Sequence, residues 1–370
     1  MPKPHTVVIG GGIAGLSVAW ALGRSGARRV TVLEQESLVG THSSARNAQI
    51  WLPVDDDVST GPLAVRSAEL MTALMGDEAA WLRRADALVL TEGPGEWVRS
   101  GAEKSGLRAK PLLKGLATMG ASLRSEATPW RVEGAGVLDP HAMVDALRRA
   151  CLDENVSIRT HSRAVTIEAD DARVTGVHLE GGERIGCDEV VNASGAWAGL
   201  MGQGVGLAVP LVPLRRHLMV LEAPSDAVKT TAWHFGARSV YVRPESGGVL
   251  ACPCDEVPMP PCLPAPDPCA LEWLASRLEG IAPSLIDAPV RTGWACLRTY
   301  AHDRELVVGP DPRLEGFAWV AGLGGRGMTV GVGAGLLCAR SMLGDLEASE
   351  HGLAEATRPD RAQPSTLQPA

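Results

Sequence analysis

The amino-acid sequence predicts an α/β protein with two domains, on three observations. The first 34 residues alternate between β-branched, helical and β-branched patterns, which is typical of a βαβ unit. Helix and strand patterns alternate again over residues 140–192, and short alternating strands return over residues 210–298. The chain has 370 residues, and at about 150 residues per domain this length favours two domains.

The βαβ unit is the clearest part of this pattern. Residues 6–9 are Thr-Val-Val-Ile and predict a buried strand, because they are largely β-branched and are followed by glycine. Apolar residues recur at helical spacing over residues 13–22, and the glycines that follow are expected to end the helix. Residues 30–33 predict a second buried strand, which Glu34 closes.

The rest of the chain is predicted to complete this domain and to add another. After Gly40 the sequence becomes polar, and we interpret it as part of a substrate-facing domain with an amphipathic helix over residues 60–75. Further helices are expected over residues 140–151, 270–278 and 329–343. Strands are expected over residues 164–168, 174–179, 189–192, 218–221, 240–243, 249–252, 306–308 and 317–320.

The composition excludes several classes of protein. The chain carries 35 Lys and Arg against 43 Asp and Glu, a formal charge of −8, so it has no general basic field to bind nucleic acid. Eight cysteines are too few for a disulfide scaffold, and a reducing cytoplasm is expected. The apolar stretches 6–23 and 316–339 are interrupted by glycine, so no transmembrane segment is expected.

The turn after the first predicted strand is Gly10-Gly11-Gly12-Ile13-Ala14-Gly15, a G-x-G-x-x-G motif. In such a turn the first glycine allows the tight bend, the second lets the backbone approach a pyrophosphate, and the third lets helix and strand pack closely. Glu34 follows at the distance where a carboxylate would accept hydrogen bonds from ribose hydroxyls. The motif and its flanks predict dinucleotide binding, and by themselves leave NAD and FAD open.

Further segments follow this motif in a characteristic order. They are THSS at 41–44, GVLDP at 136–140, VVNASGAW at 190–197, PLRR at 213–216, LR at 297–298 and GLGGRG at 322–327. In this order and spacing they resemble the FAD-dependent D-amino acid oxidase superfamily, the group with glycine oxidase, sarcosine oxidase and bacterial D-amino acid dehydrogenases. Residues 40–46, 241–244 and 294–299 look closest to D-arginine dehydrogenase.

The resemblance implies a fold and a domain division. It implies an α/β fold with a Rossmann-type (GR2-like) FAD-binding domain and an interleaved α+β substrate domain built on an antiparallel sheet. The FAD-binding domain would take residues 1–46, 132–205 and 299–345, and the substrate domain residues 47–131 and 206–298. Residues 346–370 are polar and contain proline, so a disordered tail is expected there.

The resemblance also implies which residues hold FAD. The glycine-rich turn and Glu34 would hold the ADP half, and the last turn would stabilise negative charge on the reduced flavin through the helix end that follows it. The candidate FAD-binding residues are Gly10, Gly12, Ile13, Ala14, Gly15, Glu34, Gln35, His42, Ser43, Ser44, Val165, Ala193, Ser194, Gly195, Gly324, Gly325, Arg326, Gly327, Met328 and Thr329.

Candidate substrate-binding residues follow from the same resemblance. A guanidinium matches a carboxylate in bidentate geometry, and Arg298 matches the arginine that binds the substrate carboxylate in much of the family. Arg215 matches a second such residue of the arginine dehydrogenase subgroup, with Arg216 as the alternative if the match slips by one residue. Tyr241 matches that subgroup's active-site tyrosine, and His42 is a further candidate for the active site.

The cysteines raise two more questions. Cys296 coincides with the cysteine to which monomeric sarcosine oxidases attach FAD, so a covalent link is a hypothesis beside the favoured non-covalent binding and a small buried cysteine. The cluster Cys252, Cys254, Cys262 and Cys269 lacks a standard zinc spacing, and its prolines suit a plain connector. No metal site is therefore expected.

These expectations converge on one reaction class. The favoured hypothesis is an FAD-dependent oxidoreductase that oxidises the C–N bond of an amino acid, a D-amino acid or small amine, by hydride transfer to flavin N5. Two alternatives stay open. One is an oxidase that tailors a secondary-metabolite amine or imine, and the other is the FAD subunit of a hetero-oligomeric amino-acid dehydrogenase with a partner subunit.

Overall fold

A computed structural model describes residues 2–125, 128–170 and 172–368. Its first sheet has the strand order β20-β21-β13-β1-β2-β9, with parallel pairing except between β20 and β21. The strands are β1 (His5–Ile9), β2 (Arg29–Leu33), β9 (Ser157–Arg159), β13 (Glu189–Asn192), β20 (Val307–Pro310) and β21 (Phe317–Ala321). Most residues of β1, β2, β13, β20 and β21 are buried because both faces of this sheet are covered, whereas the edge strand β9 is only partly buried.

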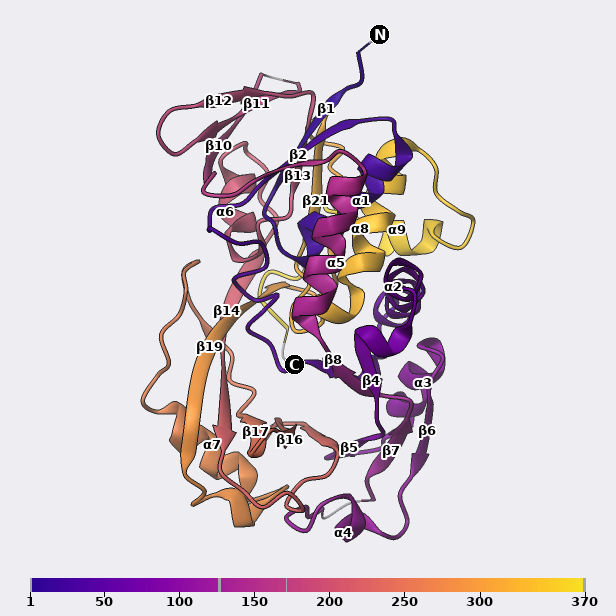
Figure 1. Ribbon diagram of the computed structural model, residues 1–370, viewed down its shortest axis with the longest axis vertical. Helices are drawn as coiled ribbons and strands as arrows, with labels where there is room; N and C mark the ends of the chain where they lie inside the picture. Colours follow the sequence, from indigo (N-terminus) through magenta and orange to yellow (C-terminus); the bar gives the residue numbers. More distant parts are fainter. Residues whose placement is uncertain (1, 126–127, 171, 369–370) are drawn as a thin grey trace.

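Helices cover the first sheet on one side, and a small sheet and a short helix cover it on the other (Figure 1). The described helices are α1 (Ile13–Ser25), α2 (Thr60–Met75), α3 (Glu96–Lys104), α4 (Leu116–Met119), α5 (Pro140–Asp153), α6 (Ala198–Gln203), α7 (Ala270–Leu278), α8 (Gly327–Leu343) and α9 (His351–Thr357). The small sheet comprises β10 (Ala164–Ala169), β11 (Val174–Leu179) and β12 (Arg184–Gly186).

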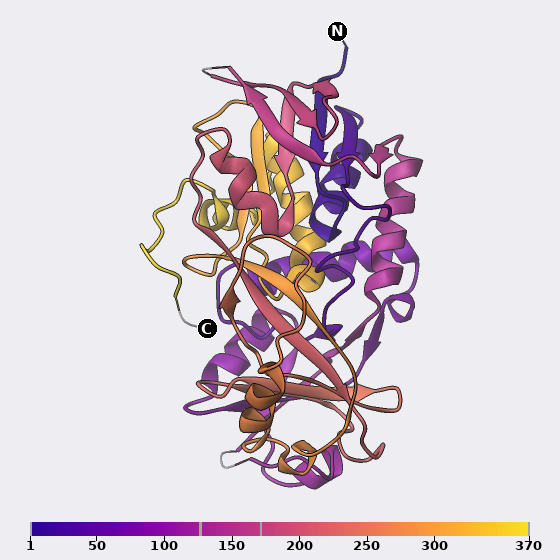
Figure 2. The same ribbon diagram turned by 90° about the vertical axis from the view of Figure 1, so that its left-hand side faces the viewer.

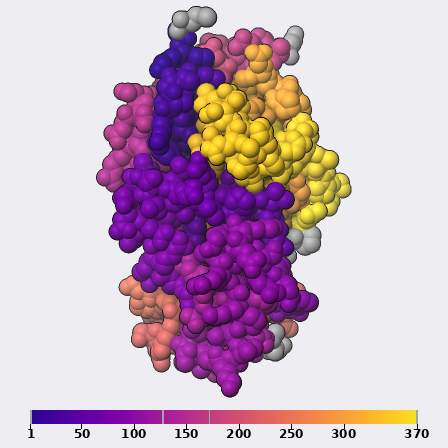
Figure 3. Space-filling view, turned by 90° about the vertical axis from the view of Figure 1, so that its right-hand side faces the viewer, coloured from indigo at the N-terminus to yellow at the C-terminus, as the bar shows by residue number. Residues whose placement is uncertain are grey.

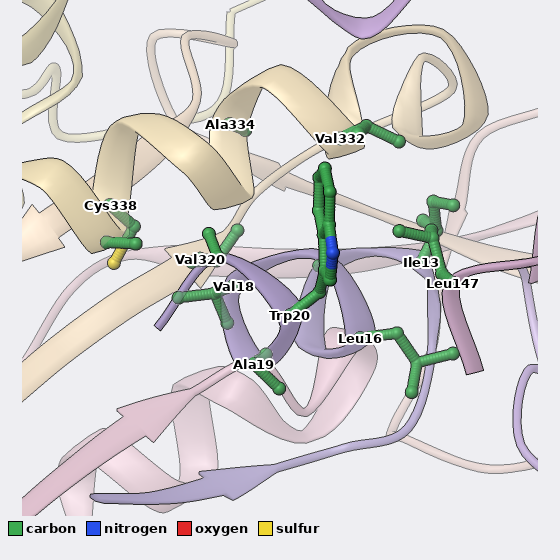
Figure 4. Close-up of a cluster of buried hydrophobic side chains, with 14 of the residues drawn as sticks. Ile13, Leu16, Val18, Ala19, Trp20, Leu147, Val320, Val332, Ala334 and Cys338 are labelled. Atoms are coloured by element: carbon green, nitrogen blue, oxygen red, sulfur yellow. The ribbon is translucent and has the colours of Figure 1, made fainter. Parts of the chain in front are cut away.

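The main core lies between α1, α5 and α8. Figure 4 shows Trp20 of α1 directed toward α8, with Val332 and Ala334 across from it. The two helices approach closely because glycines of α8 face α1: a Cβ placed on Gly335 would lie 2.6 Å from the backbone nitrogen of Val18. Small residues at this contact therefore fix how α8, and the turn before it, sit over the sheet.

The second sheet is mainly antiparallel and has the order β18-β14-β17-β16-β15-β5-β7-β6, with β19 paired to β14. Its one parallel pair joins β15 and β5. The strands are β5 (Ala87–Thr91), β6 (Arg108–Pro111), β7 (Trp130–Glu133), β14 (Leu211–Leu221), β15 (Thr231–Phe235), β16 (Val240–Glu245), β17 (Gly248–Cys252), β18 (Val257–Pro258) and β19 (Val290–Ala301). A further small sheet holds β3 (Ile50–Trp51), β8 (Gly136–Leu138) and β4 (Leu82–Arg84).

Two long strands connect the upper and lower parts of the molecule. Strands β14 and β19 pair along almost their whole length, with Leu214 opposite Arg298. Figure 2 shows these two strands of the second sheet running through the middle of the molecule toward the first sheet. The expected α/β class with a mainly antiparallel second sheet is confirmed.

Helix α2 differs from the expected division of the chain. Residues 47–131 were assigned to the substrate domain, but α2 packs against α8 and places Leu63, Ala64 and Met71 in the same core as α1. Ser67 of α2 accepts a hydrogen bond from the backbone N–H of Gly333 (2.8 Å). Its apolar face is thus buried against the first sheet's helices, whereas β5, β6 and β7 from the same stretch join the second sheet.

The C-terminal stretch also differs from expectation. In place of the disordered tail predicted over residues 346–370, the described part up to residue 368 contains α9, whose Thr357 is fully buried. Arg361 forms an ion pair with Asp303, and the Gln368 N–H donates to the carbonyl of His302. Figure 3 shows this yellow segment as part of the surface of the upper half. The polar composition suggested disorder, but polar groups such as the Arg361 guanidinium make the contacts that hold this stretch against the rest of the molecule.

In the part of the chain that the structure describes, no helix is both long enough and apolar enough to cross a membrane.

The α1–α8 contact yields a stability prediction. Gly335→Ala should lower the free energy of unfolding by about 3 kcal/mol, because the added methyl group meets the backbone of α1 and the helices must separate. Gly352→Ala is the control: it lies in α9 with open space around its Cβ position and should be neutral or stabilising by up to about 1 kcal/mol. Urea unfolding of both variants measures this, and equal midpoints would contradict the close contact.

Candidate active site

A cavity of about 380 Å³ opens at the carboxyl ends of β1, β2, β13 and β21 and extends to β16 and β19. Most of the predicted site residues line it. They are Gly10, Gly12, Ile13, Ala14, Glu34, Gln35, His42, Ser43, Ser44, Val165, Ala193, Ser194, Gly195, Tyr241, Arg298, Gly324, Gly325, Gly327, Met328 and Thr329. Gly15, Arg215 and Arg326 are predicted site residues that do not line it.

The glycine-rich turn has the geometry that its sequence predicts. Gly10 has φ +104°, a conformation that residues with a Cβ rarely adopt, and a Cβ there would lie 2.5 Å from the carbonyl oxygen of Ala193. A Cβ on Gly15 would lie 1.8 Å from the carbonyl oxygen of Gly10. Gly15 therefore acts by letting α1 pack against the turn, which explains why it lies behind the cavity wall.

The N-terminus of α1 forms one end of the cavity. Gly12 is the N-cap residue and offers no side chain, and the Ile13 N–H donates to the Ser44 hydroxyl (3.0 Å). A Cβ on Gly12 would project to within 3.1 Å of that hydroxyl. The first residues of α1 and Ser44 thus line the cavity together, and the positive end of the helix dipole favours an anionic group at this place.

Glu34 is held beside this turn at the end of β2. Its carboxylate accepts hydrogen bonds from the Gly11 N–H (2.9 Å) and the Glu36 N–H (2.9 Å), and the residue is buried. Each carboxylate oxygen has a second lone pair, so the group can still accept from hydroxyl donors in the cavity. The backbone bonds fix the orientation that such donors would meet.

His42 lies in the segment that follows β2, and the polar contacts of its ring are with two residues just after the end of that strand. Its Nε2 atom is 2.9 Å from Glu36 Oε1 and 3.1 Å from Gln35 Nε2, and its ring meets Trp197 edge-on. Although His42 lines the cavity, these contacts give it a place in the wall around the glycine-rich turn. A catalytic role for His42 stays a prediction.

The turn before α8 contributes backbone, while its arginine side chain points elsewhere. Gly324 has φ +54°, and a Cβ there would lie 2.3 Å from the Tyr300 ring. Arg326 is the N-cap residue of α8, and its guanidinium forms an ion pair with Asp57 and donates to the Arg304 carbonyl (2.7 Å). Its side chain therefore joins the start of α2 to α8, and the expected contact of its backbone amide with the flavin stays a prediction.

Arg298 and Tyr241 form the polar centre of the cavity. Arg298 Nη2 donates to the Tyr241 hydroxyl (3.0 Å), and both residues are buried. Burial raises the pKa of Tyr241 well above its ordinary value, so the hydroxyl keeps its proton. Among the described residues, no carboxylate lies within 4.0 Å of Arg298. A buried guanidinium without a protein carboxylate is an anion-binding group.

The structure separates the two alternatives at positions 215 and 216. Arg216 lies opposite Cys296 in the β14–β19 ladder, on the same face as Arg298, and pairs with Glu256 (2.7 Å). Arg215 occupies the other face, because side chains alternate along a strand, and pairs with Asp267. The expectation that Arg215 binds the substrate carboxylate is therefore not supported, since its charge already has a carboxylate partner outside the cavity.

Two cysteines lie beside this centre, Cys252 at the end of the strand expected over residues 249–252 and Cys254 in the expected connector. Cys252 lies opposite Tyr241 in the β16–β17 ladder, and the Cys254 N–H donates to Cys252 Sγ (3.3 Å). Burial favours the neutral thiol, but the hydrogen bond with Cys254 and the guanidinium groups of Arg216 and Arg298 outweigh it and lower the pKa of Cys252 to about 6. No grouping of ligands suited to a metal ion occurs among the described residues.

Comparison with known proteins identifies the class of this site. Residues 5–341 match the family model described as FAD dependent oxidoreductase. Glycine oxidase from Geobacillus kaustophilus (strain HTA426) is 24% identical over 90% of this chain and 91% of the relative. Glycine oxidase from Pseudomonas putida (strain KT2440) is 30% identical over 49% of this chain and 48% of the relative.

A longer relative matches most of this chain in sequence, and a solved structure shares its fold. The mitochondrial pyruvate dehydrogenase phosphatase regulatory subunit of Mus musculus is 25% identical over 92% of this chain, which spans 41% of that protein. This chain thus spans less than half of the length of two of the curated relatives that it matches. L-proline dehydrogenase from P. horikoshii superposes with a TM-score of 0.83 at 20% identity, covering 97% of this chain and 98% of that one.

The chain belongs to the FAD-dependent oxidoreductase family, as the resemblance in its sequence predicted. The particular likeness to D-arginine dehydrogenase stays a prediction. The residues present fit FAD: the N-terminus of α1 faces the cavity at Gly12, which has no side chain, Glu34 offers free lone pairs, and glycines line the cavity in the turn before α8.

This fit predicts a defined effect at Glu34. Glu34→Gln should weaken FAD binding by about tenfold, because a hydrogen bond to a charged acceptor is replaced by a neutral one. Glu183→Gln, which alters an exposed glutamate paired with Arg159, is the control and should leave the affinity unchanged. Fluorescence titration of the apoprotein with FAD measures both, and equal dissociation constants in all three proteins would contradict the assignment.

Proposed function

We propose that this chain oxidises the C–N bond of an amino acid, a D-amino acid or small amine, and releases an imine. The carrying observation is the buried Arg298, which contacts Tyr241, lines the cavity and has no carboxylate partner among the described residues. FAD, when bound, supplies the acceptor for the hydride. The family and the glycine oxidase relative support an amino acid or amine as substrate.

The protein's own residues would act by positioning. The Arg298 guanidinium can grip a carboxylate in bidentate geometry, and the Tyr241 hydroxyl can donate to the same group while it remains protonated. Fixing the carboxylate at two points orients the α-carbon and its C–H bond, and such orientation lowers the barrier of a reaction that needs little acid–base chemistry. The substrate amine must be neutral when the hydride leaves.

The alternative that this chain is the FAD subunit of a hetero-oligomeric dehydrogenase has one specific observation behind it. A relative that aligns with 92% of this chain is named as a regulatory subunit. Exposed apolar side chains such as Leu113 offer contact area, but nothing in the described part of the chain selects a partner. Reduction of bound flavin by an amino acid in the isolated chain would support an enzyme that is active alone, and a flavoprotein that no amino acid reduces would support the subunit alternative.

A cytoplasmic location stays a prediction.

Replacing the central arginine tests the proposed substrate contact. Arg298→Lys should lower kcat/KM for an oxidised amino acid by about 100-fold or more, because an ammonium cannot reproduce the bidentate contact. Arg291→Lys changes an exposed arginine of the same strand and should have no effect. Stopped-flow flavin reduction under anaerobic conditions measures both variants, and unchanged kinetics of Arg298→Lys would rule out its proposed role.

We further propose that FAD is held non-covalently. Cys296 lines the cavity, but burial raises the pKa of its thiol, which disfavours the nucleophilic thiolate that a thioether link requires. Precipitation of the holoprotein with acid should leave all of the flavin in the supernatant. Flavin that stays with the precipitate in the wild type, but is released from Cys296→Ser, would show the covalent link instead.

A further inference from the structure

A proline-rich segment forms part of the cavity wall. Residues 260–266, called the proline segment here, read Pro-Pro-Cys-Leu-Pro-Ala-Pro. Four of these seven residues are proline, which fixes φ and makes a chain stiff. Cys262, Leu263 and Pro264 line the cavity, although the sequence predicted a plain connector here.

Strand β14 pins the beginning of this segment. His217 is buried and lies 2.7 Å from Asp255 through Nδ1, and the Asp255 carboxylate also accepts from the His217 N–H (2.9 Å). The neighbouring Arg216 forms an ion pair with Glu256 (2.7 Å). Val257 of β18 lies opposite Arg215 of β14 in the sheet. The chain therefore leaves β14 along a fixed path before it reaches the proline segment.

The same strand pins its end. The Asp267 N–H donates to His217 Nε2 (2.8 Å), so one imidazole holds both ends of the segment. The Asp267 side chain pairs with Arg215, which gives this arginine a structural role in place of the predicted carboxylate contact. Three successive residues of β14 thus hold a stiff loop across the cavity.

Leu263 is the apolar side chain that this arrangement presents. It is 56% exposed yet lines the cavity. Other apolar and aromatic walls lie near the Arg298–Tyr241 pair: Trp233 lines the cavity with its ring centroid 4.9 Å from that of Tyr241, and Ile50 lines it as well. The cavity therefore combines one anion-binding point with apolar surface around it.

We propose that the proline segment is a specificity wall, and that Leu263 contacts the apolar side chain of the substrate whose carboxylate Arg298 binds. The inference rests on the proposed function and extends it to a substrate class: carboxylates with a branched or cyclic apolar group, in preference to glycine. An apolar group that reaches Leu263 removes exposed leucine surface from water, which favours larger ligands.

The experiment uses unreactive carboxylates and the intact holoenzyme. Acetate, 3-methylbutanoate and benzoate are titrated into the protein, and binding is followed by the change in flavin absorbance. In the wild type, the two larger ligands should bind more tightly than acetate. Leu263→Ala should weaken the binding of these two by about tenfold and leave acetate within about twofold, because only the larger ligands reach the wall.

Two controls separate this proposal from the proposed function. Leu271→Ala removes an exposed leucine of α7 outside the cavity wall and should change nothing. Arg298→Lys should weaken all three carboxylates together. If Arg298→Lys does so while Leu263→Ala keeps the wild-type ratios, the proposed function stands and the specificity wall is overturned.

The remaining outcomes are equally decisive. If Leu263→Ala weakens acetate as much as benzoate, or lowers FAD affinity while the ligand ratios stay unchanged, the segment supports the fold or covers the cofactor and the proposal is wrong. If the wild-type holoenzyme binds none of the carboxylates, both the proposed function and the specificity wall fail.

Discussion

Burying the guanidinium of Arg298 is the constraint on which the rest of the site depends. Removing such a charge from water costs several kcal/mol unless other groups replace the lost hydration. In this chain Tyr241 accepts one hydrogen bond from Arg298, and no carboxylate of the described residues lies within 4.0 Å. The site is therefore built so that a ligand can supply the missing anion, and its rigid surroundings hold the charge in place until then.

The β14–β19 ladder determines which charges meet in this centre. A strand sends successive side chains to opposite faces, so the consecutive Arg215 and Arg216 serve different purposes. Arg216 lies on the same face as Arg298 and forms an ion pair with Glu256. Arg215 lies on the other face and forms an ion pair with Asp267, directly after the proline segment. A shift of one residue in the β14–β19 register would exchange the faces of Arg215 and Arg216, and the guanidinium groups would then lie away from their present carboxylate partners.

The local elements could be predicted from the sequence, whereas their partners could not. The helix over residues 60–75 was predicted at its observed bounds, because periodicity reveals an apolar face. Periodicity does not say that Leu63 and Met71 pack against α8, and this contact depends on small residues far along the chain. Strand β14 was expected over residues 218–221 and begins at Leu211, so the register that separates Arg215 from Arg216 was not accessible.

The glycine-rich turns were the predictable part of the site, and the charge balance was not. Gly10 and Gly15 are needed because a Cβ at either position would collide with backbone atoms. The absence of a Cβ is a property of glycine that can be known from the sequence. The pKa of Cys252 is lowered because two guanidinium groups and Cys254 surround the thiol, and such neighbours come together only in the folded chain. Arg216, on the face of Arg298, shares Glu256 with Arg304, so its charge already has a carboxylate partner. Arg298 differs from Arg216, because no carboxylate of the described residues lies within 4.0 Å of it, and it is therefore the guanidinium to which the carboxylate of a ligand can bind.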